Sequence, residues 1–283
     1  MKDLAQLSGI NVYPVKSTSG IAQSRAWVSL EGISFDRRFV VADLEGRMIT
    51  ARKFPNMVTI KSTLLPDGIV LTAPGMDSLR LCIADFQRNE FECKIWSDRF
   101  IAYTTTEQAN AWFSKAIGSQ AQLLYCGEES NRYREKLDTH VSFADGYPLL
   151  VISQGSLDEL NRRASSPQTM SQFRTNLVVE GIEAFAEDSW EKIAIGEVEF
   201  QVGKACQRCV LTSVNPSTGE KMINQEPTAT LSKFRANEKG AIFFGMNLVA
   251  LNEGVIEVGD ELRVLETRTP ITYPDTTCLD THK

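Results

Sequence analysis

Two cysteines separated by two residues form the part of the sequence whose residue types are best suited to chemistry. Cys206 and Cys209 enclose Arg208 and precede the run 210–214, which contains β-branched residues. The run ends at Asn215-Pro216, and a strand bounded by such a turn signal is the simplest prediction. We therefore expect a reactive centre that is followed directly by an extended segment.

A C-x-x-C pair has several ordinary explanations. A structural zinc site needs two more Cys or His ligands, but there is no second C-x-x-C, and His140 and His282 lack ligand spacing. A thioredoxin-like dithiol belongs between a strand and a helix, whereas the run after Cys209 predicts a strand. Two buried cysteines that pack as small hydrophobic side chains are a third explanation.

The charge of Arg208 favours a fourth explanation, a thiolate that binds a metal. A guanidinium is permanently charged, so burying it is costly unless an anion meets it. A neighbouring cation also lowers the pKa of a thiol, and soft sulfur suits a soft or high-valent metal. The residues alone leave all four explanations open.

The composition is that of a folded globular protein and argues against nucleic acid and membranes as partners. Of 283 residues, 42% are hydrophobic and 23% are charged. The formal net charge of -6 disfavours binding through nucleic-acid phosphates, so an anionic ligand must be met by cations placed locally. No run approaches the roughly 18 apolar residues of a membrane span, and the N-terminus lacks the apolar core of a signal peptide.

We therefore expect a cytoplasmic protein whose six cysteines are reduced. The four outside the C-x-x-C pair are scattered, and we interpret them as core or surface thiols. They are Cys82, Cys93, Cys126 and Cys278.

Short extended segments between turn signals predict a mainly β fold. Hairpins are expected over 38–50 and, around Pro66-Asp67-Gly68, over 62–72. Further extended segments are expected at 91–96, 101–103, 149–152 and 195–202, and segment 255–264 is predicted to close a barrel. Helices are expected at 105–117 with Thr105 as cap and Gly118 as stop, after the cap Ser153, and over 227–235.

The polar stretch 127–138 lacks periodicity and predicts a linker between two lobes. We expect a β-barrel-like lobe with a helix at 1–120, a barrel-like lobe at 121–268 and a tail at 269–283. A ligand cleft is expected between the lobes.

Six segments together resemble the MOSC family (molybdenum cofactor sulfurase C-terminal domains). The branch they resemble holds the bacterial YcbX-type proteins and the mitochondrial amidoxime-reducing components. The segments follow the family's order over roughly residues 7–265, and they support the same mainly β fold of two lobes. They are Tyr13-Pro14-Val15-Lys16-Ser17, Asp36-Arg37-Arg38-Phe39, Phe173-Arg174-Thr175-Asn176, Ala186-Glu187-Asp188-Ser189-Trp190, the string from Lys204 to Gly219, and Phe244-Gly245-Met246-Asn247.

The resemblance implies a molybdenum atom held by the dithiolene of molybdopterin and by a protein thiolate. By its position in the motif that thiolate is Cys209, with Cys206 as a neighbour. Arg37 and Arg38 would point to opposite faces of a strand, and the family's Asp-Arg-Phe spacing favours Arg38, with Arg37 as the alternative. The cofactor-binding residues that the resemblance implies are Lys16, Ser17, Arg38, Asp145, Gly146, Tyr147, Arg174, Gln207, Arg208 and Asn247.

The activity that the resemblance implies is the two-electron reduction of N-hydroxylated bases or amidoximes. The sequence lacks the C-x4-C-x2-C spacing of a plant-type ferredoxin. Either a separate flavoprotein reductase or ferredoxin is expected to supply electrons, or the chain is a shortened form of a longer protein. A carrier that holds or moves the cofactor or sulfur without turnover remains the alternative. Pyridoxal phosphate binding is a further expectation that comes with the resemblance.

Overall fold

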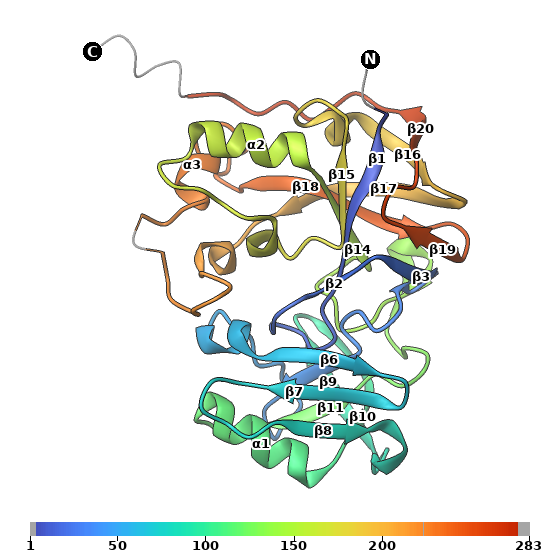
Figure 1. Cartoon of the computed structure of the whole chain (residues 1–283), viewed down its shortest axis with the longest axis vertical. Coiled ribbons are helices and arrows are strands. Elements are labelled where there is room, and N and C mark those ends of the chain that lie inside the picture. Colours follow the sequence, from blue (N-terminus) through green and yellow to red (C-terminus); the bar gives the residue numbers. More distant parts are fainter. Residues whose placement is uncertain (1–3, 223, 277–283) are drawn as a thin grey trace.

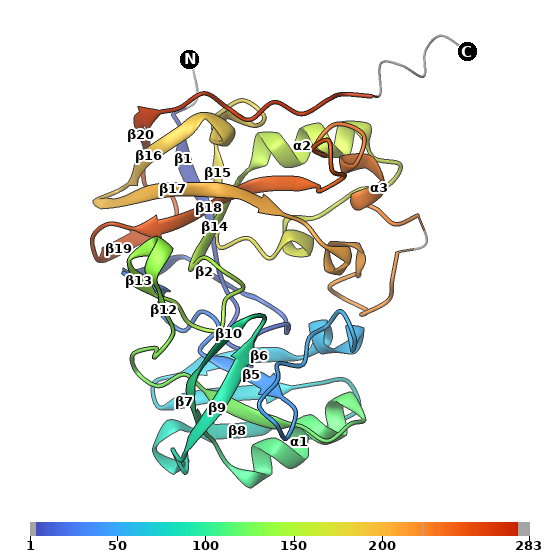
Figure 2. The ribbon, with the colours of Figure 1, turned by 180° about the vertical axis from the view of Figure 1, so that it is seen from behind.

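Curled β-sheets in two lobes make up most of the protein, as Figures 1 and 2 show from opposite sides. The computed structural model describes residues 4–222 and 224–276. The mainly β prediction is confirmed. In the described residues no helix has the length and apolar character needed to cross a bilayer.

The upper lobe in Figure 1 is built on one large sheet. Within the described residues this sheet has eight strands in the order β2-β1-β15-β14-β18-β17-β16-β20. Only β14 and β15 pair in parallel among its strands. The strands are β1 (Gln6–Val12), β2 (Ile21–Gln23), β14 (Leu149–Ser153), β15 (Leu177–Glu180), β16 (Trp190–Ile195), β17 (Val198–Gln207), β18 (Phe243–Ala250) and β20 (Leu262–Thr267).

Alternating side chains bury one face of this sheet. Along β17, Val198, Phe200 and Val202 are buried, and partly exposed residues lie between them. This period of two is what a half-buried strand requires. The buried side chains pack in one core with residues of β1, β14 and β16, so the strand that leads to the cysteines is held firmly.

The lower lobe combines two smaller sheets with a helix (Figure 1). One sheet has the order β5-β11-β10-β9 and the other β6-β7-β8. Their strands are β5 (Phe39–Ala42), β6 (Lys61–Leu65), β7 (Gly68–Thr72), β8 (Leu79–Cys82), β9 (Glu90–Ile95), β10 (Asp98–Thr104) and β11 (Gln122–Tyr125). The predicted hairpin over 62–72 is thus present as the β6–β7 pair.

Helix α1 (Glu107–Ile117) covers the lower lobe. It ends at Gly118 with a φ of 67°, as predicted, but Thr106 rather than Thr105 is its cap and accepts a hydrogen bond from the Ala109 amide. Thr105 is buried and its hydroxyl donates to the Leu123 carbonyl. The Thr105 hydroxyl is therefore not available to cap the helix, and the helix begins one residue later than predicted.

Helix α2 (Gln154–Arg163) has the predicted cap, since Ser153 accepts from the Ser156 amide. Helix α3 (Thr228–Leu231) lies inside the predicted range 227–235 but is much shorter. The remaining helical segments are 3-10 turns. They are η1 (Pro55–Thr59), η2 (Ile83–Asp85), η3 (Glu135–Leu137), η4 (Met170–Phe173), η5 (Ala186–Ser189) and η6 (Val210–Ser213).

The chain crosses between the lobes more than once, so residue 120 does not separate them cleanly. Strand β1 pairs with β15, and β3 (Arg25–Ser29) lies between β4 (Gly32–Ile33) and β19 (Gly254–Glu257). The first strands therefore belong to the upper lobe. The segment 255–264 also differs from its prediction, because β19 pairs with β3 and β20 with β16, each in a different sheet.

The predicted linker 127–138 is partly ordered. It contains β12 (Tyr133–Arg134), which pairs with β13 (Thr139–His140), and it buries the side chain of Arg132 almost completely. Among the scattered cysteines, Cys93 and Cys126 are buried and Cys82 is half-buried. The prediction for Cys278 and the end of the tail lies outside the described residues.

Candidate functional site

A cleft between the lobes gathers the predicted site residues. It encloses about 930 Å³ of empty space, its open mouth included. Every residue that the sequence pointed to lines this cleft except Arg38. Those that do are Lys16, Ser17, Asp145, Gly146, Tyr147, Arg174, Gln207, Arg208, Cys209 and Asn247.

Cys209 lies where the polypeptide leaves the large sheet. Strand β17 ends at Gln207, which pairs with Phe243 at the start of β18. The pairing extends one residue further, since the Arg208 amide donates to the Ile242 carbonyl, and the run after Cys209 then forms the 3-10 turn η6 instead of the predicted strand. The amide and hydroxyl of Thr212 both donate to the Cys209 carbonyl, which fixes the backbone that carries the thiol.

The two cysteines are free thiols. Both are partly exposed and no disulfide joins them. Burial raises the pKa of the Cys206 thiol, although the Arg208 guanidinium opposes this. Within residues 4–222 and 224–276, no three Cys, His, Asp or Glu side chains lie together as a metal cluster, so the pair lacks the extra ligands of a structural zinc site.

Arg208 places a guanidinium at the floor of the cleft. Its Nε donates to the Phe244 carbonyl at 2.8 Å, and its Nη1 donates to the Phe173 carbonyl at 3.1 Å. Its Nη2 is buried and has no hydrogen-bond partner among the described residues. A buried charged donor without a partner is costly, so this nitrogen favours an anion in the cleft.

Arg174 presents a second unpaired nitrogen. Its backbone is left-handed, with a φ of 55°, and its Nη1 donates to the Thr18 carbonyl at 2.5 Å. Its Nη2 is buried and, in the part of the chain that the structure describes, without a partner. Burial, with the nearby charge of Arg37, lowers the pKa of Arg174 to about 10. An anion would relieve both the desolvation and the repulsion.

Arg37, not Arg38, faces the cleft, which corrects the sequence-based choice. Arg37 donates to the Asn176 side chain at 3.0 Å and to the Arg174 carbonyl at 3.1 Å, and it lies over the Tyr13 ring. Arg38 points the other way and pairs with Glu31 at 2.6 Å. Arg37 lies before β5 and has a left-handed backbone with a φ of 48°. The alternation of side chains between the two faces of a strand, on which the choice of Arg38 relied, therefore does not hold at this position.

Lys16 reaches the cleft but is already engaged. Its Nζ donates to the Phe143 carbonyl at 2.8 Å and to Asp145 Oδ1 at 2.6 Å. Burial lowers the pKa of Lys16, and the Asp145 carboxylate opposes this. Ser17 follows with a φ of 73°, so the backbone turns sharply at the cleft. Lys16, like Arg37, which forms an ion pair with Asp36, therefore contributes less free positive charge than Arg174 and Arg208 do.

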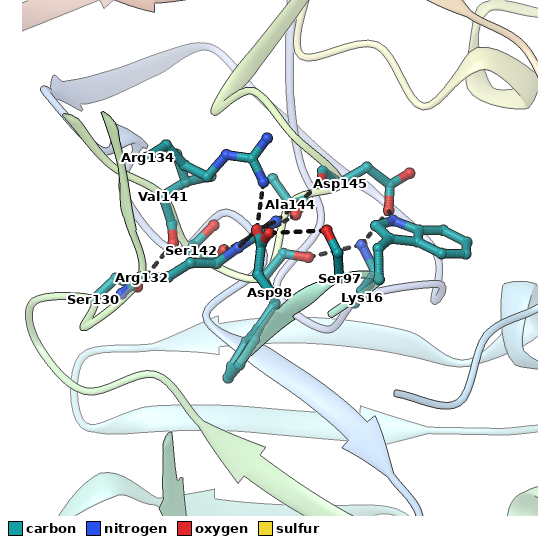
Figure 3. Close-up of polar contacts among 12 residues, drawn as sticks. Lys16, Ser97, Asp98, Ser130, Arg132, Arg134, Val141, Ser142, Ala144 and Asp145 are labelled. Carbon is teal, nitrogen blue, oxygen red and sulfur yellow. Dashed lines mark hydrogen bonds and ion pairs between the residues drawn. The ribbon is translucent and has the colours of Figure 1, made fainter. Parts of the chain in front are cut away.

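The loop that carries Asp145 is held from beneath by Arg132. Figure 3 shows the Arg132 and Arg134 side chains converging on Asp98, with Asp145 and Lys16 close by. The Arg132 guanidinium donates to the carbonyls of Ser142 and Asp145 at 3.0 Å each, and to that of Ala144 at 2.5 Å. A single buried side chain thus fixes the backbone before Gly146 and Tyr147.

Tyr147 and Asn247 complete the wall beside β17. A side chain at Gly203 would collide with Tyr147, because a Cβ there would lie 2.4 Å from the tyrosine ring. Asn247 donates to the Lys204 carbonyl at 2.9 Å. The two residues therefore lie against the strand that leads to Cys209.

Several cleft residues were missed by the sequence interpretation. Thr50, Arg52 and Trp96 come from the lower lobe, and Asn176 lies at the end of the Phe173–Asn176 motif. Asn176 could have been chosen from that motif. No local signal distinguishes Arg52 or Trp96, because their place in the cleft depends on contacts between distant segments.

Two family models match this chain. Residues 4–120 match the MOSC N-terminal beta barrel domain, and residues 138–263 match the MOSC domain. Mitochondrial amidoxime-reducing component 1 of Homo sapiens is 30% identical over 285 residues, covering 94% of this chain and 84% of that protein.

Two further relatives have related names. Mitochondrial amidoxime reducing component 2 of Bos taurus is 30% identical over 280 residues, covering 92% of this chain and 83% of that protein. Molybdenum cofactor sulfurase of Oryza sativa subsp. japonica is 28% identical over 267 residues, covering 86% of this chain but 32% of that protein.

Proposed function

Because this chain belongs to the family of MOSC-domain proteins, we propose that its cleft binds the molybdenum cofactor and reduces N-hydroxylated compounds. The electrons would come from a separate donor, a flavoprotein reductase or a ferredoxin. The relatives' names, amidoxime-reducing components, support N-reductive chemistry in general.

The observation that carries the proposal is the pair of buried, unpaired guanidinium nitrogens in the cleft that contains Cys209. Arg174 and Arg208 each leave Nη2 without a partner in the described residues. A molybdopterin phosphate is an anion with several acceptor oxygens, which is the chemistry that such donors require. The residues present therefore fit the cofactor.

The metal and the phosphate of the cofactor each have candidate partners of suitable chemistry in the cleft. Cys209 would supply the thiolate for the metal, since soft sulfur suits molybdenum and the thiol is accessible from the cleft. Arg37, Arg174 and Arg208 would bind the phosphate, and Ser17 and Asn247 line the same cleft as neutral polar contacts. Asp145 holds Lys16 in place and so fixes the loop at the mouth.

The cofactor, when bound, supplies a two-electron couple. With two protons and two electrons, an N-hydroxylated compound R–NHOH becomes R–NH₂ and water. The chain's own residues bind and orient the cofactor and leave the mouth of the cleft open to the substrate.

Metal analysis of cysteine variants tests the proposal. The chain would be produced in cells able to make the pterin, as wild type, Cys209→Ser and the matched control Cys206→Ser. We expect molybdenum, and turnover of an N-hydroxylated purine with an artificial reductant, in the wild type and in Cys206→Ser. Cys209→Ser should lose both. A wild-type protein with neither molybdenum nor turnover would contradict the proposal.

The likeness to a molybdenum cofactor sulfurase favours one alternative, a carrier of cofactor or sulfur without substrate turnover. A sulfur carrier would bear a persulfide on Cys209 and contain no molybdenum. Mass spectrometry of the intact protein distinguishes this from the reductase.

Two expectations remain predictions. The relatives' names refer to mitochondria, whereas for this chain we keep a cytoplasmic location as part of the proposal. Pyridoxal phosphate binding also remains a prediction.

A further inference from the structure

A tryptophan at the mouth of the cleft occupies a backbone position that favours glycine. Trp96 is the first residue of the two-residue loop between β9 and β10, where Ile95 pairs with Asp98. Its φ is 53°, in the left-handed region. Such loops favour Gly, Asn or Asp at positions of positive φ, and a bulky residue there is strained. The strained position presents an indole to the cleft.

Contacts from two other segments fix the orientation of this indole. The Trp96 Nε1 donates to Asp145 Oδ1 at 2.9 Å, the same oxygen that Lys16 binds at 2.6 Å. The Arg52 guanidinium lies over the ring, 4.5 Å from its centroid. The ring is therefore held at its edge and covered on one face.

Trp96 remains partly accessible in spite of these contacts. Trp96 is 42% exposed and lines the cleft. Because Arg52 lies over one face, a planar ligand in the cleft would have to stack on the opposite face. A flat, rigid aromatic surface in a cleft loses little conformational entropy when a planar group stacks on it.

We propose that Trp96 is the surface on which the planar part of the substrate stacks, so that the cleft selects conjugated ring compounds over saturated ones. This inference rests on the proposed reductase function and adds a specificity-determining residue to it. Trp96 and Arg52 come from the lower lobe, whereas Cys209, Arg174 and Arg208 come from the upper lobe. The cofactor's groups and the substrate's ring would thus be bound by opposite walls of one cleft.

The test compares Trp96→Leu and Trp96→Phe with wild-type holoprotein. The matched control is Trp27→Leu, because Trp27 is 47% exposed but lies on β3 outside the cleft. An N-hydroxylated purine is the planar substrate, and N-cyclohexylhydroxylamine is the saturated one. Adenine, which cannot be reduced, reports binding through titration calorimetry without any turnover.

Loss of stacking should act on KM and not on kcat. In Trp96→Leu we expect the purine KM and the adenine dissociation constant to rise by about 5- to 150-fold, the range for base–aromatic stacking. Trp96→Phe should recover most of this affinity. The KM for N-cyclohexylhydroxylamine and the molybdenum content should not change, and Trp27→Leu should behave as wild type.

Three results would overturn the inference. They are an unchanged adenine affinity in Trp96→Leu, equal losses for both substrates, or a loss of molybdenum content, which would mean that the indole contacts the cofactor instead. If the wild type turns over neither substrate but binds adenine in a Trp96-dependent way, the proposed reductase function fails and the stacking surface stands.

Discussion

Replacing Arg174 by methionine is expected to weaken anion binding without strongly destabilising the ligand-free protein. In the free protein the unpaired Nη2 costs about 1–3 kcal/mol. Against this, the bond from Nη1 to the Thr18 carbonyl contributes about 1.5–3 kcal/mol, and the contact with the Tyr13 ring about 0.5–2 kcal/mol. The opposing contributions sum to a net destabilisation between about -1 and 4 kcal/mol, with a central value of about 1.5 kcal/mol.

When an anion is bound, no unpaired nitrogen offsets the favourable contacts of Arg174. Each charge-assisted hydrogen bond from Arg174 to an anion is worth about 1.5–3 kcal/mol, so its loss should raise the dissociation constant by about 10- to 150-fold. At a ligand concentration 100 times the wild-type dissociation constant, binding stabilises the wild type by about 2.7 kcal/mol. After a 100-fold loss of affinity the same concentration stabilises the variant by only about 0.4 kcal/mol.

Urea unfolding with and without pyrophosphate, as a stand-in for the phosphate, measures both quantities. Arg162→Met is the matched control, because Arg162 is exposed on α2 and pairs with Glu159 at 2.7 Å outside the cleft. It should keep the full stabilisation by pyrophosphate. The reasoning is refuted if Arg174→Met keeps it too, or if the ligand-free variant loses more than about 4 kcal/mol.

Two further changes test the loop at the mouth. Burial alone would raise the pKa of Asp145, but the Lys16 ammonium outweighs it and holds that pKa well below the ordinary value of 3.8. The lowered pKa stabilises the folded protein at pH values above the Asp145 pKa in the unfolded chain, and this stabilisation is lost as the pH falls towards the Asp145 pKa in the folded protein. Asp145→Asn lacks this titration, so its free energy of unfolding should fall less than that of the wild type between about pH 4 and pH 2. Equal shifts in the urea midpoint would contradict this. Arg132→Met should lower the free energy of unfolding by about 3–5 kcal/mol, because it leaves buried carbonyls without their donor and removes a buried ion pair with Asp98. Arg134→Met removes only a more exposed ion pair with Asp98, so it should lower the free energy of unfolding by less than about 1 kcal/mol. Similar urea midpoints for these two variants would show that Arg132 does not hold the loop.

Local signals predicted the elements whose hydrogen bonds are local. The Pro-Asp-Gly turn predicted the β6–β7 hairpin, Gly118 predicted the end of α1, and Ser153 predicted the start of α2. In each case neighbouring residues satisfy the backbone donors and acceptors. The wrong cap at Thr105 has the opposite cause, since a distant carbonyl on β11 engages its hydroxyl.

The sequence indicated most of the residues of the candidate site but not how they are arranged in space. The resemblance to a family singled out cations from separate segments, and the fold brings Arg174 and Arg208 into one cleft with Cys209. The choice between Arg37 and Arg38 failed, because the backbone conformation at Arg37 is left-handed and does not follow strand alternation. The position of Trp96 depends on Asp145 and Arg52, for which no spacing rule exists.

By itself the sequence determined the period-two burial of strands such as β17, the turns and caps, and the presence of a thiol beside a permanent charge. Only the tertiary structure decided where β17 loses its partner, and therefore that the segment after Cys209 turns instead of continuing as a strand. It also decided which guanidinium nitrogens are buried without a partner. The reason is that strand pairing and desolvation depend on residues far apart in the chain, whereas turns, caps and alternation depend on near neighbours.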